Sequence, residues 1–119
     1  MSLTDEKRCV AGASLRYQLQ PGRFRFLEPH VRLLFAYMLE ADEWRNPWEV
    51  PVVGAAVQKD GVLMLAFANN AIVSINGGRA WLDAAIEDVI RRAELDGSED
   101  AEFLRSWPRV RDNRLRLGG

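Results

Sequence analysis

A glycine-rich turn formed by Asn76, Gly77, Gly78 and Arg79 joins a strand-like segment to a helix-like one. The start of a helix presents unpaired backbone N–H groups and a partial positive charge, and glycine lets a ligand approach the backbone. With the guanidinium of Arg79 nearby, these four residues predict a weak site for a phosphate or carboxylate. The turn lacks the P-loop lysine and the full dinucleotide-binding spacing. We therefore favour the alternative, a tight turn in which Asn76 or Gly78 caps the helix.

Trp44, Arg45 and Trp48 lie within five residues of one another in a connecting segment that also contains Asn46-Pro47. Tryptophan and arginine are enriched among the few residues that carry most of the binding energy of an interface. This segment therefore predicts a weak partner-binding surface. The alternative, which we favour, is that both indoles fold back onto the core, because large aromatic side chains are usually well buried.

Basic residues gather at the end of the chain, where the arginines are residues 105, 109, 111, 114 and 116. Arg109, Arg111, Arg114 and Arg116 form a weak candidate for nucleic-acid binding, which requires positive charge gathered on one face. An acidic region precedes this tail and offers an internal partner, or a partner on another subunit. Together with the overall charge of −1, it makes nucleic-acid binding the less favoured interpretation.

The remaining residues with reactive side chains do not form a recognisable catalytic or metal-binding cluster in the sequence. His30 is the only histidine and Cys9 the only cysteine, so we expect no zinc site, no disulfide within the chain and no cofactor. We expect His30 to be a surface or capping residue beside Pro29. Asp83 and Glu87 lie one helical turn apart, but carboxylates on the polar face of a helix usually serve solvation.

Alternation and helical spacing predict the elements that would position these residues. Strands are expected over residues 14–20 and 23–26, which form a hairpin around Pro21-Gly22, and over 50–58, 62–68 and 71–75. Helices are expected from Pro29 to Asn46-Pro47, from Gly77-Gly78 to Gly97, and from Ser98 to Pro108. Residues 1–13 are expected to be a mobile leader, and residues 109–117 a possible edge strand.

The predicted fold is therefore α+β: an antiparallel sheet of about five strands, in the order β-β-α-β-β-β-α-α, packed against two amphipathic helices. Residues 14–119 are expected to form one domain, since 119 residues suffice for a single core. Residues 1–8 lack the apolar stretch typical of a signal peptide, and the longest apolar runs are too short to span a bilayer. The expected location is therefore the cytoplasm, and no membrane is expected as a partner.

The segment Val62 to Ala68 is apolar at every position. Such a strand is expected to be covered on both faces, and one copy of the chain has few elements with which to cover it. The sequence therefore favours a homodimer. The function that we expect is that of a non-enzymatic protein-interaction or assembly module. The alternatives are a small-anion binder or minor enzyme that uses the Gly77-Gly78 turn, and a nucleic-acid binder that uses the tail.

Overall fold

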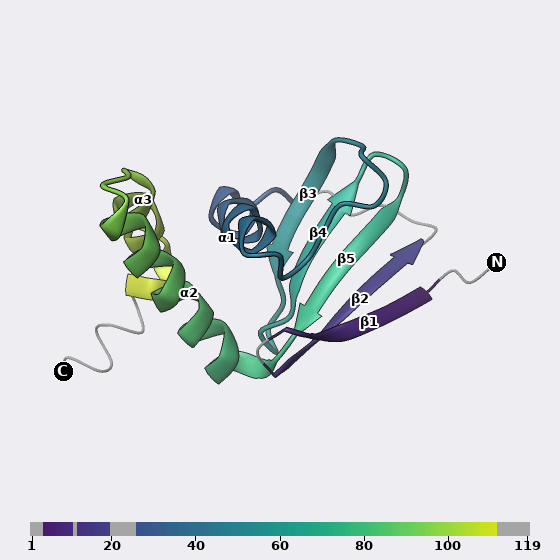
Figure 1. The fold of residues 1–119 in the computed structure, drawn as a ribbon, viewed down its shortest axis with the longest axis horizontal. Helices are drawn as coiled ribbons and strands as arrows, with labels where there is room; N and C mark the ends of the chain where they lie inside the picture. The colour runs from purple at the N-terminus through teal and green to yellow at the C-terminus, as the bar shows by residue number, and fades with distance from the viewer. Residues whose placement is uncertain (1–3, 11, 20–25, 112–119) are drawn as a thin grey trace.

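The computed structural model describes residues 4–10, 12–19 and 26–111 of the chain. Within these residues the fold is α+β with an antiparallel sheet (Figure 1). The strands are β1 (Thr4–Val10), β2 (Ala13–Leu19), β3 (Val52–Val57), β4 (Leu63–Phe67) and β5 (Ala71–Asn76), arranged as β1-β2-β5-β4-β3. The helices are α1 (Pro29–Glu40), α2 (Gly78–Leu95) and α3 (Asp100–Arg105), followed by a helical turn at 108–111.

The three-stranded meander of β3, β4 and β5 follows directly from the sequence. Apolar runs separated by the Lys59-Asp60-Gly61 and Asn69-Asn70 turns pair in antiparallel register, with Leu65 opposite Ala55 on one side and Val73 on the other. Asn70 adopts a positive φ of 67°, which asparagine tolerates better than most residues. The predicted meander is therefore confirmed, with β3 and β4 slightly shorter than expected and β5 one residue longer.

The predicted first hairpin is wrong. Its first arm, β2, is present, but β2 pairs with β1 on one side and with β5 on the other. Thr4–Val10 therefore belong to the sheet, although the sequence indicated a leader over residues 1–13. The proposed second arm at 23–26 lies mostly outside the described residues. The sequence of β1 has no clear apolar alternation and therefore did not predict a strand. An edge strand can form without such a pattern, because it is held largely by backbone hydrogen bonds, which every residue except proline can donate.

Phe26 to Glu28 close the opposite edge of the sheet. Ala55 donates its backbone N–H to the Phe26 carbonyl, and Glu28 donates its own to the Ala55 carbonyl, both at 2.7 Å. Burial raises the pKa of the Glu28 carboxyl, while a hydrogen bond from the backbone of Val57 lowers it. These contacts occupy part of the open edge of β3, which limits uncontrolled pairing with other strands.

Helix α1 begins at Pro29 as expected but ends at Glu40, earlier than the sequence predicts. Asp42, with a φ of 58°, reverses the chain after the helix. The reversal brings the Trp44 indole back over α1, where its N–H donates to the Phe35 carbonyl at 2.6 Å. The gain from burying a tryptophan with its polar group paired explains why the helix stops before that residue.

One apolar core joins the sheet and all three helices. Helix α1 packs on β3 and β4, while α2 packs on α3 and α1 rather than along the sheet. Figure 1 shows the three helices on one side of the sheet, with α2 running away from the end of β5. The expectation that two helices cover the sheet is therefore only partly met. Tyr37 links α1 to α3, since its hydroxyl donates to Asp100 at 2.9 Å.

The second face of the sheet carries mostly small and medium apolar side chains on β3, β4 and β5, with Ser74 as a polar residue among them. Ala66 lies opposite Ile72, and Ala56 lies opposite Met64. Both alanines are buried by their neighbours, yet neither belongs to the core shared with the helices. On β2 the same face turns polar at Arg16. The apolar strand β4 is therefore covered by α1 on one side, and no described helix covers its other side.

Candidate protein-interaction sites

The Gly77-Gly78 turn is closely packed at the start of α2. Gly77 is the residue that caps the helix, and a Cβ built on it would lie 2.4 Å from the ring of Trp81. The Arg79 guanidinium donates from Nε and Nη2 to the carbonyl of Lys59, at 3.0 and 2.7 Å. Arg79 thus holds the β3–β4 turn against the helix. The arrangement agrees with a tight turn, but the predicted cap is wrong, because Gly77 and not Asn76 or Gly78 caps the helix. Anion binding at this turn stays a prediction.

The tryptophan-rich segment is folded largely onto the core. Trp44 is only 4% exposed and packs edge-on against Phe35, so it is not accessible to a partner. Trp48 is half-buried between Tyr17 and Phe67. Arg45 is exposed, and its backbone N–H donates to the Tyr17 hydroxyl. Core packing therefore accounts for both indoles, while partner binding through Arg45 and the open edge of Trp48 stays a prediction.

Two arginines near the end of the chain bind acidic residues of α2. The guanidinium of Arg109 lies 3.2 Å from Asp83, and that of Arg105 lies 2.7 Å from Glu94. Residues 108–111 form a helical turn and not the edge strand that the sequence suggested. Arg111 lies at the end of this turn, and Arg114 and Arg116 lie outside the described residues. The acidic residues of α2 therefore neutralise part of the basic cluster, as expected if the acidic region is its internal partner.

Large apolar side chains are exposed where the entry to α1 meets α3. Phe26 is 73% exposed, Leu27 50% and Phe103 40%. A groove of about 350 Å³ opens here, which we call the Leu27 groove. Its lining includes Leu27, Arg32, Leu33, Ala36, Asp100 and Phe103.

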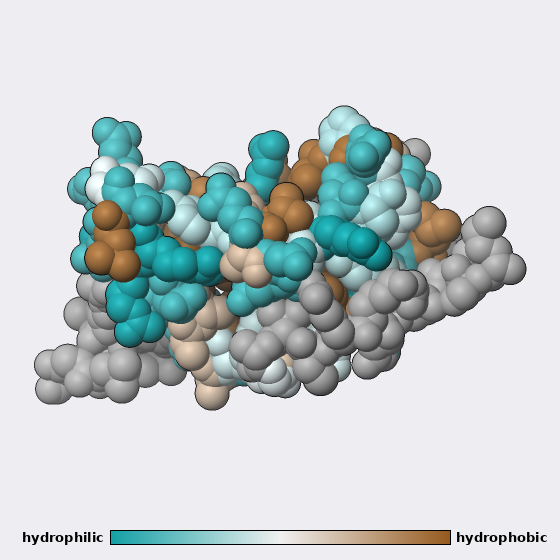
Figure 2. Space-filling view, viewed as in Figure 1, coloured by the Kyte–Doolittle hydropathy of each residue, from teal (hydrophilic) through white to brown (hydrophobic). Residues whose placement is uncertain are grey.

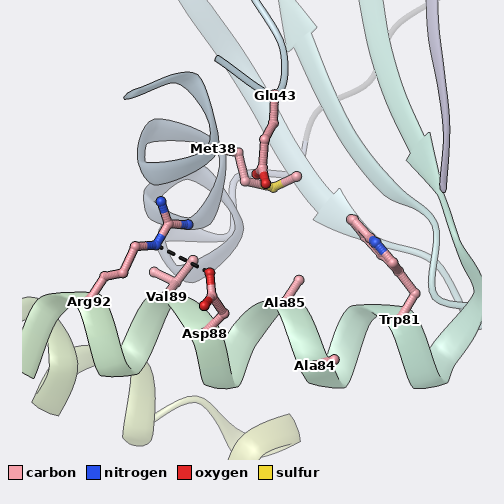
Figure 3. A pocket seen from close by; sticks show the side chains of 8 residues that line it. All are labelled: Met38, Glu43, Trp81, Ala84, Ala85, Asp88, Val89 and Arg92. Atoms are coloured by element: carbon pink, nitrogen blue, oxygen red, sulfur yellow. Dashed lines mark ion pairs between the residues drawn. The ribbon is translucent and has the colours of Figure 1, made fainter. Parts of the chain in front are cut away.

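A second groove, the Glu43 groove, runs along α2 on the side that faces α1 (Figure 3). It holds about 200 Å³ and is lined by residues that include Met38, Glu43, Trp81, Ala85, Asp88 and Arg92. Figure 3 shows the Trp81 indole at one end, and Asp88 and Arg92 paired at the other. Burial raises the pKa of the Glu43 carboxyl, while the charge of Arg92 lowers it and that of Asp88 raises it.

Apolar atoms reach the surface elsewhere in separate patches. Figure 2 shows hydrophobic side chains scattered among hydrophilic ones on the face that it presents. Leu95, at the end of α2, is 87% exposed but lines neither groove. Single exposed apolar residues of this kind are common, and the informative feature is several of them around one depression.

The sequence did not indicate either groove. Leu27 and Phe103 are far apart in the chain, and Phe103 lies beside the Ala101–Leu104 face that α3 buries. A weak signal was available, because the apolar pair Phe26-Leu27 is separated only by Glu28 from the proline that starts α1. Glu43 had no such signal, since its position depends on the chain reversal after α1.

Neither groove resembles a metal centre. Within residues 4–10, 12–19 and 26–111, no group of three or more histidine, cysteine, aspartate or glutamate side chains is placed to hold an ion. Among the helices that the structure describes, none has the length and apolarity needed to cross a bilayer.

No protein-family model matches the chain, and neither the curated proteins nor the solved structures include a significant match.

Proposed function

We propose that this chain is a non-enzymatic protein-interaction module that assembles as a homodimer. The observation that carries the proposal is the Leu27 groove, where Leu27 and Phe103 remain exposed around a depression. Exposed apolar clusters of this kind are typical of surfaces that bind other proteins. The second face of the sheet supports the homodimer, because a second copy would cover the apolar side chains of β4 that no described helix covers.

The lining of the Leu27 groove favours binding over catalysis. Its walls are apolar apart from Arg32 and Asp100, and the Asp100 carboxylate already accepts the hydrogen bond of Tyr37. The groove therefore suits an apolar side chain, such as leucine or phenylalanine, displayed on a partner. Arg32 at the rim would fix the orientation of the partner by pairing with an acidic or carbonyl oxygen.

The first prediction concerns variants of the Leu27 groove. Leu27→Ser removes an exposed apolar contact, and Ala36→Arg fills the groove from an exposed position of α1. Each is expected to weaken partner binding about tenfold, since losing one apolar side-chain contact costs about 1–2 kcal/mol. The measurement is affinity capture from a lysate of the source cells, followed by titration of the captured protein against each variant.

Leu95→Ser is the matched control, because it removes a more exposed leucine that lies outside the groove. The partner should bind this control as it binds the natural chain. Equal binding by Leu27→Ser, Ala36→Arg and the control would show that the groove does not bind that partner. Circular dichroism on all variants separates loss of binding from loss of the fold.

A further inference from the structure

The Glu43 groove combines an apolar surface with the carboxylate of Glu43. Two carboxylates, those of Glu43 and Asp88, face it together with the single guanidinium of Arg92. Ala84, Ala85 and the half-buried Trp81 supply its accessible apolar surface, while Met38 and Val89 lie buried beneath. The groove thus offers an oxygen acceptor beside a surface on which an aliphatic chain can lie.

Arg92 is already engaged by other groups. Its Nε lies 3.3 Å from Asp88 Oδ2, although the N–H does not have hydrogen-bond geometry. Its guanidinium carbon lies 5.9 Å from the centroid of the Tyr37 ring, within range of a cation–π contact. Arg91 also pairs with Asp88, with its Nη2 3.9 Å from Asp88 Oδ1, so the charge of Asp88 is balanced. Arg92 acts on Glu43 only through longer-range attraction.

The Glu43 carboxylate has no hydrogen-bond donor within the described part of the chain. Burial in apolar surroundings makes its charged form costly, which is why its pKa is raised. A partner that brings a cation to this carboxylate would remove that cost. Charge complementarity therefore requires a positively charged occupant and disfavours an acidic one.

The shape of the groove favours a segment of protein as the occupant. Trp81 and Arg92 mark its ends on α2, and the eleven-residue step between them corresponds to roughly 16 Å of helix. A lysine or arginine side chain joins a cation to an aliphatic stem, which matches the carboxylate and the apolar floor. A neighbouring apolar residue of the same segment would reach towards the Trp81 indole.

From this geometry we propose that the Glu43 groove docks a basic, amphipathic helical segment of a partner protein. An arginine or lysine of that segment pairs with Glu43, and its apolar face lies on Trp81, Ala84 and Ala85. This site is separate from the Leu27 groove and does not depend on the function proposed above, since the two grooves share no lining residue.

The test uses the full chain and a fluorescein-labelled helical probe peptide. The probe has about 16 residues, so that it can form a helix, and carries leucine and arginine on one face with alanine elsewhere. A second peptide has glutamate in place of every arginine. Fluorescence anisotropy is expected to show saturable binding of the arginine probe and none of the glutamate probe.

Variants then locate the probe on the surface. Glu43→Gln keeps the shape of the side chain but removes the charge, and it is expected to weaken binding of the arginine probe about tenfold. Ala85→Leu fills the groove on a helix that leucine favours, and it is expected to weaken binding by a similar factor. Glu40→Gln is the matched control, because Glu40 is an exposed carboxylate three residues away that does not line the groove.

Three results would overturn the proposal. One is the absence of saturable binding of the arginine probe. Another is equal weakening by Glu40→Gln and Glu43→Gln, which would indicate attraction to the acidic surface in general. The third is unchanged binding by both Glu43→Gln and Ala85→Leu. Leu27→Ser should bind the probe like the natural chain, so failure at one groove is distinguishable from failure at the other.

Discussion

The His30 imidazole lies against α3, although the sequence indicated only a surface or capping residue. Its ring stacks on Phe103 with the two centroids 4.2 Å apart, and its Nε2 lies 3.3 Å from the Ser106 hydroxyl. Trp107 is also nearly parallel, at 5.5 Å. Sequence could not anticipate this contact because the aromatic partners are more than 70 residues away. His30 therefore joins the start of α1 to the last described turns of the chain.

A pH dependence of stability follows from this position. Burial lowers the pKa of His30 below its ordinary 6.5, while a hydrogen bond to the Phe103 backbone acts in the opposite direction. The fold therefore favours the neutral ring. Its contribution to the free energy of unfolding is complete above pH 6.5 and is lost as the pH falls from there through the lowered pKa.

We predict that His30→Ala lowers the free energy of unfolding by about 1 kcal/mol above pH 6.5, the usual scale of a stacking contact. The difference between the variant and the natural chain should shrink as the pH falls. Denaturant unfolding of both proteins at several pH values measures it. Burial raises the pKa values of Glu28 and Glu43, so these groups change the stability with pH in the opposite direction. Their effect is common to both proteins and cancels when the two free energies of unfolding are subtracted. A difference that stays constant with pH would contradict the prediction.

The junction of β5 and α2 shows how a close contact restricts one position within an element. The backbone at Gly77 passes so near Trp81 and Ala13 that an added Cβ would lie 2.4 and 2.8 Å from their side chains. Sequence indicated a turn at this glycine pair, but not the side chains that require glycine there. Ala13 belongs to β2 and Trp81 to α2, and only the folded chain brings both side chains against Gly77.

Gly77→Ala is expected to lower the free energy of unfolding by about 1–3 kcal/mol, because the new methyl group must displace packed atoms. Thermal and denaturant unfolding would measure the loss. In a Trp81→Ala background the cost of Gly77→Ala should be smaller, since the main obstacle is gone. Equal costs in both backgrounds would show that the contact with Trp81 is not the cause.

The elements themselves were predictable to different extents. Strands β3 to β5 and helix α2 were indicated close to their observed bounds, because their apolar patterns are long and their turns carry glycine or asparagine. Strand β1 was missed, and the end of α1 was placed too late. Both errors occur where distant contacts decide the structure: pairing with β2 in the first case, and burial of Trp44 in the second.

At the scale of the whole molecule, the question is whether one copy of the chain can cover the second face of its sheet. Ile72 and Met64 are half-buried there, next to buried alanines that lie outside the shared core. Two such faces can pack against each other at about 10 Å, as the layers of a sandwich do. This arrangement would shelter β4 on both sides.

We predict that the natural chain is dimeric in solution and that Ile72→Arg makes it monomeric, because a charge would be buried in the interface. Light scattering coupled to size-exclusion chromatography measures the mass. Ser14→Arg is the control, since Ser14 lies on the polar β2 part of the same face. A monomeric natural chain at high concentration would contradict both the dimer and the role given to this face.

Sequence by itself determined the α+β class, the antiparallel meander, the start of α1 and nearly all of α2. These features follow from local patterns: the period of apolar residues, the turn-forming residues between them and the proline at a helix start. Tertiary structure alone decided that Thr4–Val10 belong to the sheet, that α2 leaves the sheet, and that Leu27 and Glu43 face open grooves. Each of these features depends on contacts between residues that are far apart in the chain. A local sequence pattern does not specify such contacts.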